Sequence, residues 1–137
     1  MGTKFREDLA MRRLATVLLP LILTVACRDP GAPRTNVALG VEQVVVPTEL
    51  APNAELVATI TVITGGCKKF ERFTTTRSEG QLTVEARGSD ATPGQVCTRD
   101  LRFEPHEYRA SLPAGNPVVL AVRRPNGPDL VRQIQIR

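Results

Sequence analysis

The most regular segment of this chain is Glu55-Leu-Val-Ala-Thr-Ile-Thr-Val-Ile-Thr64, along which apolar and polar side chains alternate. A period of two places one set of side chains on one face of a β-strand and the other set on the opposite face. The segment therefore predicts a strand with one buried face. The side chains expected on that face are Leu56, Ala58, Ile60 and Val62, with Thr59 and Thr61 on the other.

The same alternation extends outward from this segment and predicts further strands. The residues expected to face inward are Leu82, Val84 and Ala86, then Leu101 and Phe103, then Tyr108, Ala110 and Leu112, and then Val118, Leu120 and Val122. Clusters of turn-forming residues separate these runs at intervals of about ten residues. We expect no helix, and strands near 37–46, 55–64, 68–77, 81–87, 96–104, 107–112, 117–124 and 130–136.

We therefore predict an all-β fold, a small antiparallel β-sandwich of about seven or eight strands over residues 37–137. Immunoglobulin-like and transthyretin-like sandwiches have this size. The likeness is one of architecture alone, because the Trp and the cysteine spacing of true immunoglobulin domains are missing. The composition agrees, since 42% apolar and 23% charged residues in a chain of 137 are typical of one globular domain.

The chain before residue 37 has a different composition. Arg12 and Arg13 precede 13 uncharged residues, 14–26, which is the pattern of a secretory signal peptide. A transmembrane helix needs about 20 apolar residues, and Pro20 interrupts this run. We therefore expect export, by general secretion rather than by the twin-arginine route. Met11 is an alternative start of the chain.

The uncharged run ends in Leu23-Thr-Val-Ala-Cys27, which resembles the lipobox of bacterial lipoproteins, with Val25 and Ala26 matching the pattern. The resemblance covers residues 11–27 only. It implies that residues 1–26 are a lipoprotein signal peptide and that the Cys27 thiol carries diacylglycerol. Two or three acyl chains, at about 0.8 kcal/mol per buried methylene, hold a protein stably on a membrane. The alternative is that Cys27 is an ordinary small residue at the end of a cleaved signal.

Residues 27–36 contain two prolines and one glycine and show no apolar periodicity. This composition predicts a flexible, lipid-anchored tether. The anchor implies a place in the bacterial cell envelope. We expect the periplasmic face of the outer membrane in a cell with two membranes, because no acidic residue directly follows Cys27.

The chain has three cysteines, so at least one of them is left over when the others form a disulfide. An odd cysteine in an exported protein needs a separate role. If Cys27 takes lipid, Cys67 and Cys97 remain as a pair, and an exported location favours a disulfide between them. Neither cysteine has the CxxC spacing of a redox pair.

His106 is the single histidine and hence the only ordinary base that shuttles protons near neutral pH. It lies in Glu104-Pro-His-Glu107, which we expect to form a solvated bend between two strands. We accordingly predict that the protein is not an enzyme and that it binds neither a metal nor a cofactor. The alternative is a small metal-handling or hydrolytic site that combines His106 with Glu104 and Glu107.

The formal charge of +4 falls to +2 when residues 1–26 are removed, because four basic and two acidic residues leave with them. The remaining arginines are spread along the chain and there is no Trp, which argues against a nucleic-acid partner. We expect a non-catalytic binding or structural module with a protein partner in the envelope. The surfaces to test are the exposed strand edges and the arginine-rich strand ends with Arg99, Arg102, Arg123 and Arg124.

Overall fold

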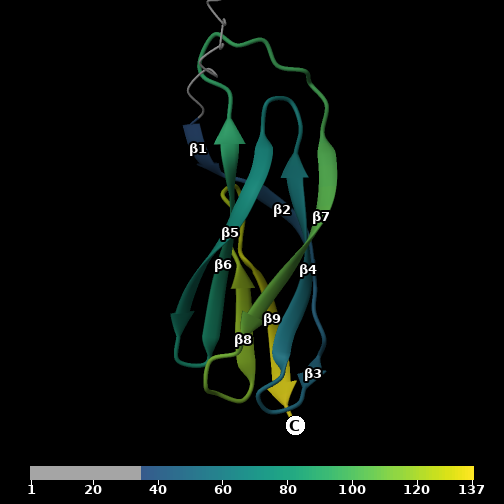
Figure 1. Ribbon diagram of the computed structural model, residues 1–137, viewed down its shortest axis with the longest axis vertical. Helices are drawn as coiled ribbons and strands as arrows, with labels where there is room; N and C mark the ends of the chain where they lie inside the picture. The colour runs from purple at the N-terminus through teal and green to yellow at the C-terminus, as the bar shows by residue number, and fades with distance from the viewer. Residues whose placement is uncertain (1–34) are drawn as a thin grey trace, which may run out of the picture.

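The computed structural model describes residues 35–137, so the predicted signal peptide, Cys27 and most of the predicted tether lie outside this range. Within the range the chain forms nine strands in two sheets (Figure 1), which confirms the prediction of an all-β sandwich. No helix in this range is long and apolar enough to cross a membrane. The strands are β1 (Thr35–Ala38), β2 (Gly40–Val45), β3 (Glu49–Leu50), β4 (Glu55–Thr64), β5 (Lys69–Ser78), β6 (Gln81–Asp90), β7 (Arg102–Ser111), β8 (Val118–Val122) and β9 (Leu130–Ile136).

Strand β6 is the centre of the six-stranded sheet. β5 pairs along one of its edges, while β8 and β1 pair with residues 81–84 and 87–90 of β6. The sheet continues from β8 to β9 and β3, and the three-stranded sheet has the order β2-β4-β7. Two parallel pairs, β6–β8 and β3–β9, interrupt the predicted antiparallel arrangement. Among the described strands, β5 and β7 each pair on one side only, so both are edge strands.

The core lies between the sheets and consists of the alternating apolar side chains. The predicted inward sets of 55–64, 81–87 and 117–124 are fully buried, and Tyr108 and Ala110 are nearly so. Burial of one Val, Leu or Ile side chain contributes about 1.5–3 kcal/mol. The alternation therefore accounts both for the extended conformation of these segments and for their packing.

Leu39 divides the first predicted strand, 37–46, into two. Its side chain is buried, and its N–H donates to the carbonyl of Ala86 at 2.8 Å. Because β1 belongs to the six-stranded sheet and β2 to the other, the chain crosses between the sheets at this residue. Thr35 and Asn36, which we assigned to the tether, already pair with β6. Both are exposed, so no apolar pattern marked them as strand residues.

One continuous strand, β7, replaces the two strands predicted at 96–104 and 107–112. Pro105 does not end it, because an edge strand tolerates a residue that lacks an N–H. Since the alternation then runs unbroken back from Tyr108, Phe103 faces outward and is 52% exposed, and Leu101 is 63% exposed. The prediction that Leu101 and Phe103 face inward is wrong.

The sandwich is elongated, and its two ends differ (Figure 1). We call one the disulfide end, because it carries the 65–68 turn and the 91–101 loop, which the predicted Cys67–Cys97 disulfide joins. Cys97 lies in the loop and not in a strand as we expected. β1 also begins here, since Thr35 pairs with Asp90, the last residue of β6. The far end carries the turns 51–54, 79–80 and 112–117.

Candidate functional site

A polar pocket of about 280 Å³ lies at the disulfide end, between the two sheets. It receives residues from β4, the 65–68 turn, β5 and β7, and three of its residues are cationic and one is acidic. The residues that line it are Thr64, Gly65, Gly66, Lys68, Lys69, Phe70, Arg102 and Glu104.

Thr64 forms the inner wall of this pocket. It occupies the last inward-facing position of β4, after Val62 in the alternation, and only 3% of its surface is exposed. Its Oγ1 atom is buried and has no hydrogen-bond partner. An unsatisfied buried hydroxyl costs about 1–3 kcal/mol, and a buried polar group without a partner calls for an explanation. Thr64 therefore places a hydroxyl that has no protein partner at the inner wall of the pocket.

His106 lies beside the pocket on the inner side of β7. Its ring stacks on Phe70 with a centroid distance of 4.0 Å and meets Phe73 edge-on at 6.4 Å. Its Nε2 atom is buried and makes no hydrogen bond, and Oε2 of Glu104 lies 3.5 Å away. The prediction of a solvated bend at His106 is therefore wrong: the residue is part of a regular strand and packs on aromatic rings.

Glu107 does not join the other two residues of the predicted Glu104–His106–Glu107 group. Neighbouring residues of a strand point to opposite faces, and Glu107 lies on the outer face, where Oε1 accepts from Nε of Arg109 at 2.6 Å. This contact raises the pKa of Arg109 above its ordinary value. Over residues 35–137 no group of three or more His, Cys, Asp or Glu residues is placed to hold a metal ion.

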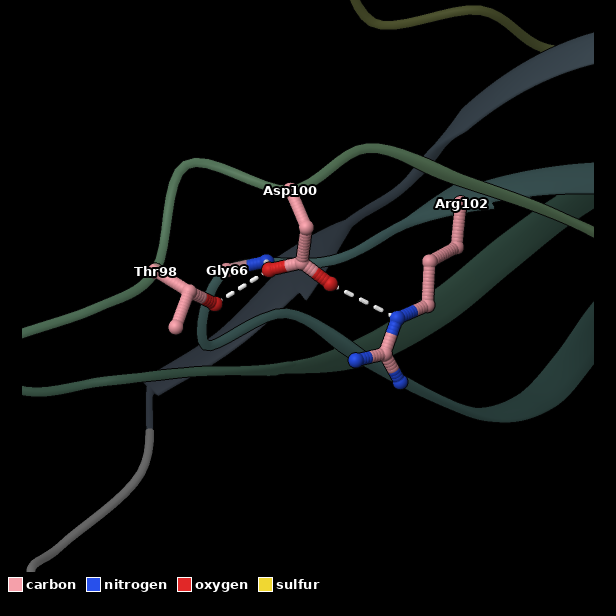
Figure 2. Close-up of polar contacts among 4 residues, drawn as sticks. All are labelled: Gly66, Thr98, Asp100 and Arg102. Atoms are coloured by element: carbon pink, nitrogen blue, oxygen red, sulfur yellow. Dashed lines mark hydrogen bonds and ion pairs between the residues drawn. The ribbon is translucent and has the colours of Figure 1, made fainter.

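Asp100 fastens the 91–101 loop to the 65–68 turn (Figure 2). Its Oδ1 atom accepts from the hydroxyl of Thr98 and, at 3.0 Å, from the N–H of Gly66, while Oδ2 accepts from Nε of Arg102 at 2.7 Å. These contacts lower the pKa of Asp100 from 3.8 to about 2. The hydrogen bond from Thr98 is the largest cause, followed by the Gly66 N–H, and the positive charge of Arg102 adds to both.

Gly65 permits the loop to approach the turn this closely. Its φ of +109° is one that L side chains rarely adopt, and a Cβ atom there would lie 2.4 Å from the carbonyl oxygen of Asp100. The Asp100 contacts and the disulfide therefore hold the loop against the turn that forms the rim of the pocket.

Strand β7 is held beside β5 by polar side chains, although no backbone ladder joins the two strands. The hydroxyls of Thr75 and Tyr108 are 2.9 Å apart, and Nη1 of Arg77 donates to the carbonyl of Ser111 at 2.6 Å. These contacts fix the spacing of the two edge strands, which form opposite walls of the pocket.

The four arginines expected at functional surfaces lie in two places. Arg99 and Arg102 are exposed at the disulfide end, together with Lys68 and Lys69. Arg123 and Arg124 lie in the β8–β9 turn, where Arg124 borders a smaller cleft of about 100 Å³ with Gly40, Val41, Ile63, Pro125 and Asn126. Only Arg102 of the four lines the polar pocket.

A larger cavity of about 530 Å³ lies at the far end. Its lining comes from the 51–54 turn, from residues 111–115 and from Ile136, and it includes no titratable side chain. Polar groups that converge on a pocket mark a binding site more strongly than volume does. The smaller pocket at the disulfide end is therefore the better candidate.

Sequence reasoning missed Thr64 and Asp100. A signal for Thr64 was present in the alternation, because Thr64 lies an even number of residues after the inward-facing Leu56 and Val62 and so points to the same face. A polar residue at such a core position is unusual. No comparable signal existed for Asp100, whose contact with Gly66 spans 34 positions of the chain.

The sequence matches no family model, and neither a curated protein nor a solved structure is similar to the chain.

Proposed function

We propose that this protein is a lipoprotein of the bacterial cell envelope, anchored through Cys27, and that its sandwich is a non-catalytic binding module. The lipobox-like segment before Cys27 supports the anchor. The polar pocket at the disulfide end supports binding as the role of the sandwich.

The single observation that carries the binding role is the unpartnered hydroxyl of Thr64. It lies deep in a pocket whose charged residues are Lys68, Lys69, Arg102 and Glu104, so cations predominate. A group that both hydrogen-bonds to Thr64 and carries negative charge fits this lining. We propose that the group is an acidic side chain of a protein partner in the envelope.

A non-catalytic role is favoured by the surroundings of His106. Nucleophilic catalysis by Ser, Thr or Cys needs a base within hydrogen-bond reach of the nucleophile. The Nε2 atom of His106 makes no hydrogen bond, and Cys67 and Cys97 are joined to each other. The arrangement around His106 thus resembles aromatic packing more than an acid–base pair.

The anchor is tested by metabolic labelling with a fatty acid that carries a detectable tag. We expect label on the wild-type protein and none on the Cys27→Ser variant. The matched controls are Cys67→Ser and Cys97→Ser, which leave the lipobox-like segment intact and keep the label. Label that persists in Cys27→Ser contradicts the anchor.

The binding role is tested by crosslinking in intact envelopes followed by pull-down. We expect a protein that crosslinks to the wild type to be lost from Thr64→Val and from Arg102→Ala. Thr76→Val is the matched control, because it makes the same change at an exposed position of β5. An identical set of crosslinked proteins from all four chains contradicts the pocket as the binding site.

A further inference from the structure

We propose that the disulfide end lies against the membrane that holds the lipid anchor, and that anionic phospholipids are its partner there. The inference rests on the proposed anchor at Cys27. Three features of this end point to the bilayer: the place where β1 begins, the exposed apolar side chains, and the charge.

The described chain begins at the disulfide end, where Thr35 pairs with Asp90. Eight peptide units separate Cys27 from Thr35, and they span at most about 28 Å when fully extended. The ten residues of β4 alone are longer, at about 33 Å. An anchor at Cys27 therefore keeps this end within a strand's length of the lipid surface.

Three apolar side chains at this end are turned to solvent. Val96 is 95% exposed, Leu101 is 63% exposed and Phe103 is 52% exposed. All three lie around the 65–68 turn: Val96 precedes the Cys97 of the disulfide, Leu101 follows the Asp100 that binds Gly66, and Phe103 is the second residue of β7. Side chains of this kind on peripheral proteins enter the boundary of headgroups and acyl chains to a depth of about 5–10 Å.

The charge at this end suits an anionic surface. Segments 65–69 and 90–104 carry four cations, Lys68, Lys69, Arg99 and Arg102, against three carboxylates, those of Asp90, Asp100 and Glu104, so the net charge is positive. At the far end, the turns 51–54, 79–80 and 112–117 carry a single charged residue, Glu79. Near an anionic leaflet each Lys or Arg strengthens binding by a factor of about five. The electrostatic attraction is thus directed to the same end as the apolar side chains.

The polar pocket stays available in this orientation. Phe103 alternates with Arg102 and Glu104 along β7, so Phe103 and the pocket lie on opposite faces of this strand. Leu101, which is also exposed, lies in the loop just before the strand. Contact through the loop and the outer face of β7 therefore leaves the inner face uncovered. Lys68, Lys69 and Arg102 line the pocket there and act on the bilayer only through the range of their charge, about 8 Å at physiological salt.

The test uses a single tryptophan, because the natural chain has none. Mature lipidated protein with the Phe103→Trp substitution is reconstituted into vesicles of phosphatidylglycerol and phosphatidylcholine whose acyl chains carry bromine. Val57→Trp is the matched control, because Val57 lies on the same outer face of the three-stranded sheet and is 38% exposed. Phe103 pairs with Ile63 of β4, and Val57 lies six residues from Ile63 along β4, further from the disulfide end. Six residues of strand correspond to about 20 Å.

Flotation and fluorescence are measured on the same vesicles. We expect both variants to float, and bromine to quench the indole at position 103 at least about twofold more than the indole at position 57. Flotation with equal quenching overturns the orientation while leaving the proposed anchor intact. Protein that does not float contradicts the anchor itself, and with it the orientation that depends on the anchor.

A charge-reversed version of the Phe103→Trp variant, with Lys68→Glu and Arg99→Glu, identifies the lipid partner. We expect its quenching on anionic vesicles to fall to the level seen on phosphatidylcholine alone. Arg132→Glu, at an exposed position of β9, is the control and keeps the full quenching. Quenching that is unchanged by the reversal overturns anionic phospholipid as the partner.

Discussion

Thr64 combines a core position with a group that the core does not satisfy. Its neighbours in the alternation of β4 are Ile60 and Val62, both fully buried, and its Oγ1 atom lacks a partner. No protein group in the described part of the chain therefore compensates for the burial of this hydroxyl. Binding and stability can make opposite demands on such a residue.

Thr64→Val should raise the free energy of unfolding by about 1 kcal/mol, because valine keeps the shape of threonine and removes the unpaired hydroxyl. Equilibrium unfolding in urea measures the change. Thr76→Val, at an exposed position of β5, should leave the unfolding free energy nearly unchanged. A decrease in Thr64→Val would show that the hydroxyl is satisfied in the folded protein.

Asp100 should make the stability of the folded protein depend on pH in the acidic range. Its folded pKa of about 2 is below the ordinary value of 3.8. A depressed pKa contributes stability that is present above pH 3.8 and is lost as the pH falls toward 2. The wild type should therefore have a higher midpoint of thermal unfolding than Asp100→Asn near pH 6, and the difference should shrink between pH 4 and pH 2. A difference that is constant over this range contradicts the assignment.

At the scale of elements, the 91–101 loop depends on two fastenings, the Asp100 contacts and the disulfide. Removing the disulfide with Cys67→Ser should lower the free energy of unfolding by about 3 kcal/mol, because the loop it closes restricts the unfolded chain. Urea unfolding of the oxidised wild type, the reduced wild type and the variant measures this. Reduction and substitution should agree, and an oxidised protein no more stable than the reduced one would contradict the prediction.

Pro105 has a second consequence for β7. An edge strand with a free row of N–H and C=O groups pairs readily with another chain, and a proline on the edge prevents this. Pro105→Thr should therefore increase self-association while leaving the fold intact, as measured by sedimentation velocity over a range of concentrations. Pro113→Thr, in a turn at the far end, is the control and should stay at the wild-type association state.

At the scale of the whole molecule, the sequence predicts the sandwich because its longest strands each bury one face. The alternation in 55–64 and 81–87 reports that burial directly, residue by residue. The alternation does not predict how strands divide between the sheets or where a strand ends. Leu39 redirects the chain between sheets although its local pattern is continuous, and Pro105 is tolerated only because β7 has no partner on one side.

The candidate site was less predictable than the fold, for a related reason. The pocket is assembled from segments that are distant in the sequence, and no short motif records their meeting. His106 was found because it is the single histidine, but its partner Phe70 lies 36 positions away in β5. The disulfide was the exception, since the count of cysteines limits the pairings.

The junction at Leu39 also has a mechanical consequence. A force that enters at Thr35 and is directed along the axis of β1 is perpendicular to the hydrogen bonds between β1 and β6. Such a pull loads all the rungs of the ladder together instead of opening them one at a time. Because β1 continues through Leu39 into β2, such a force also reaches the three-stranded sheet through the covalent chain.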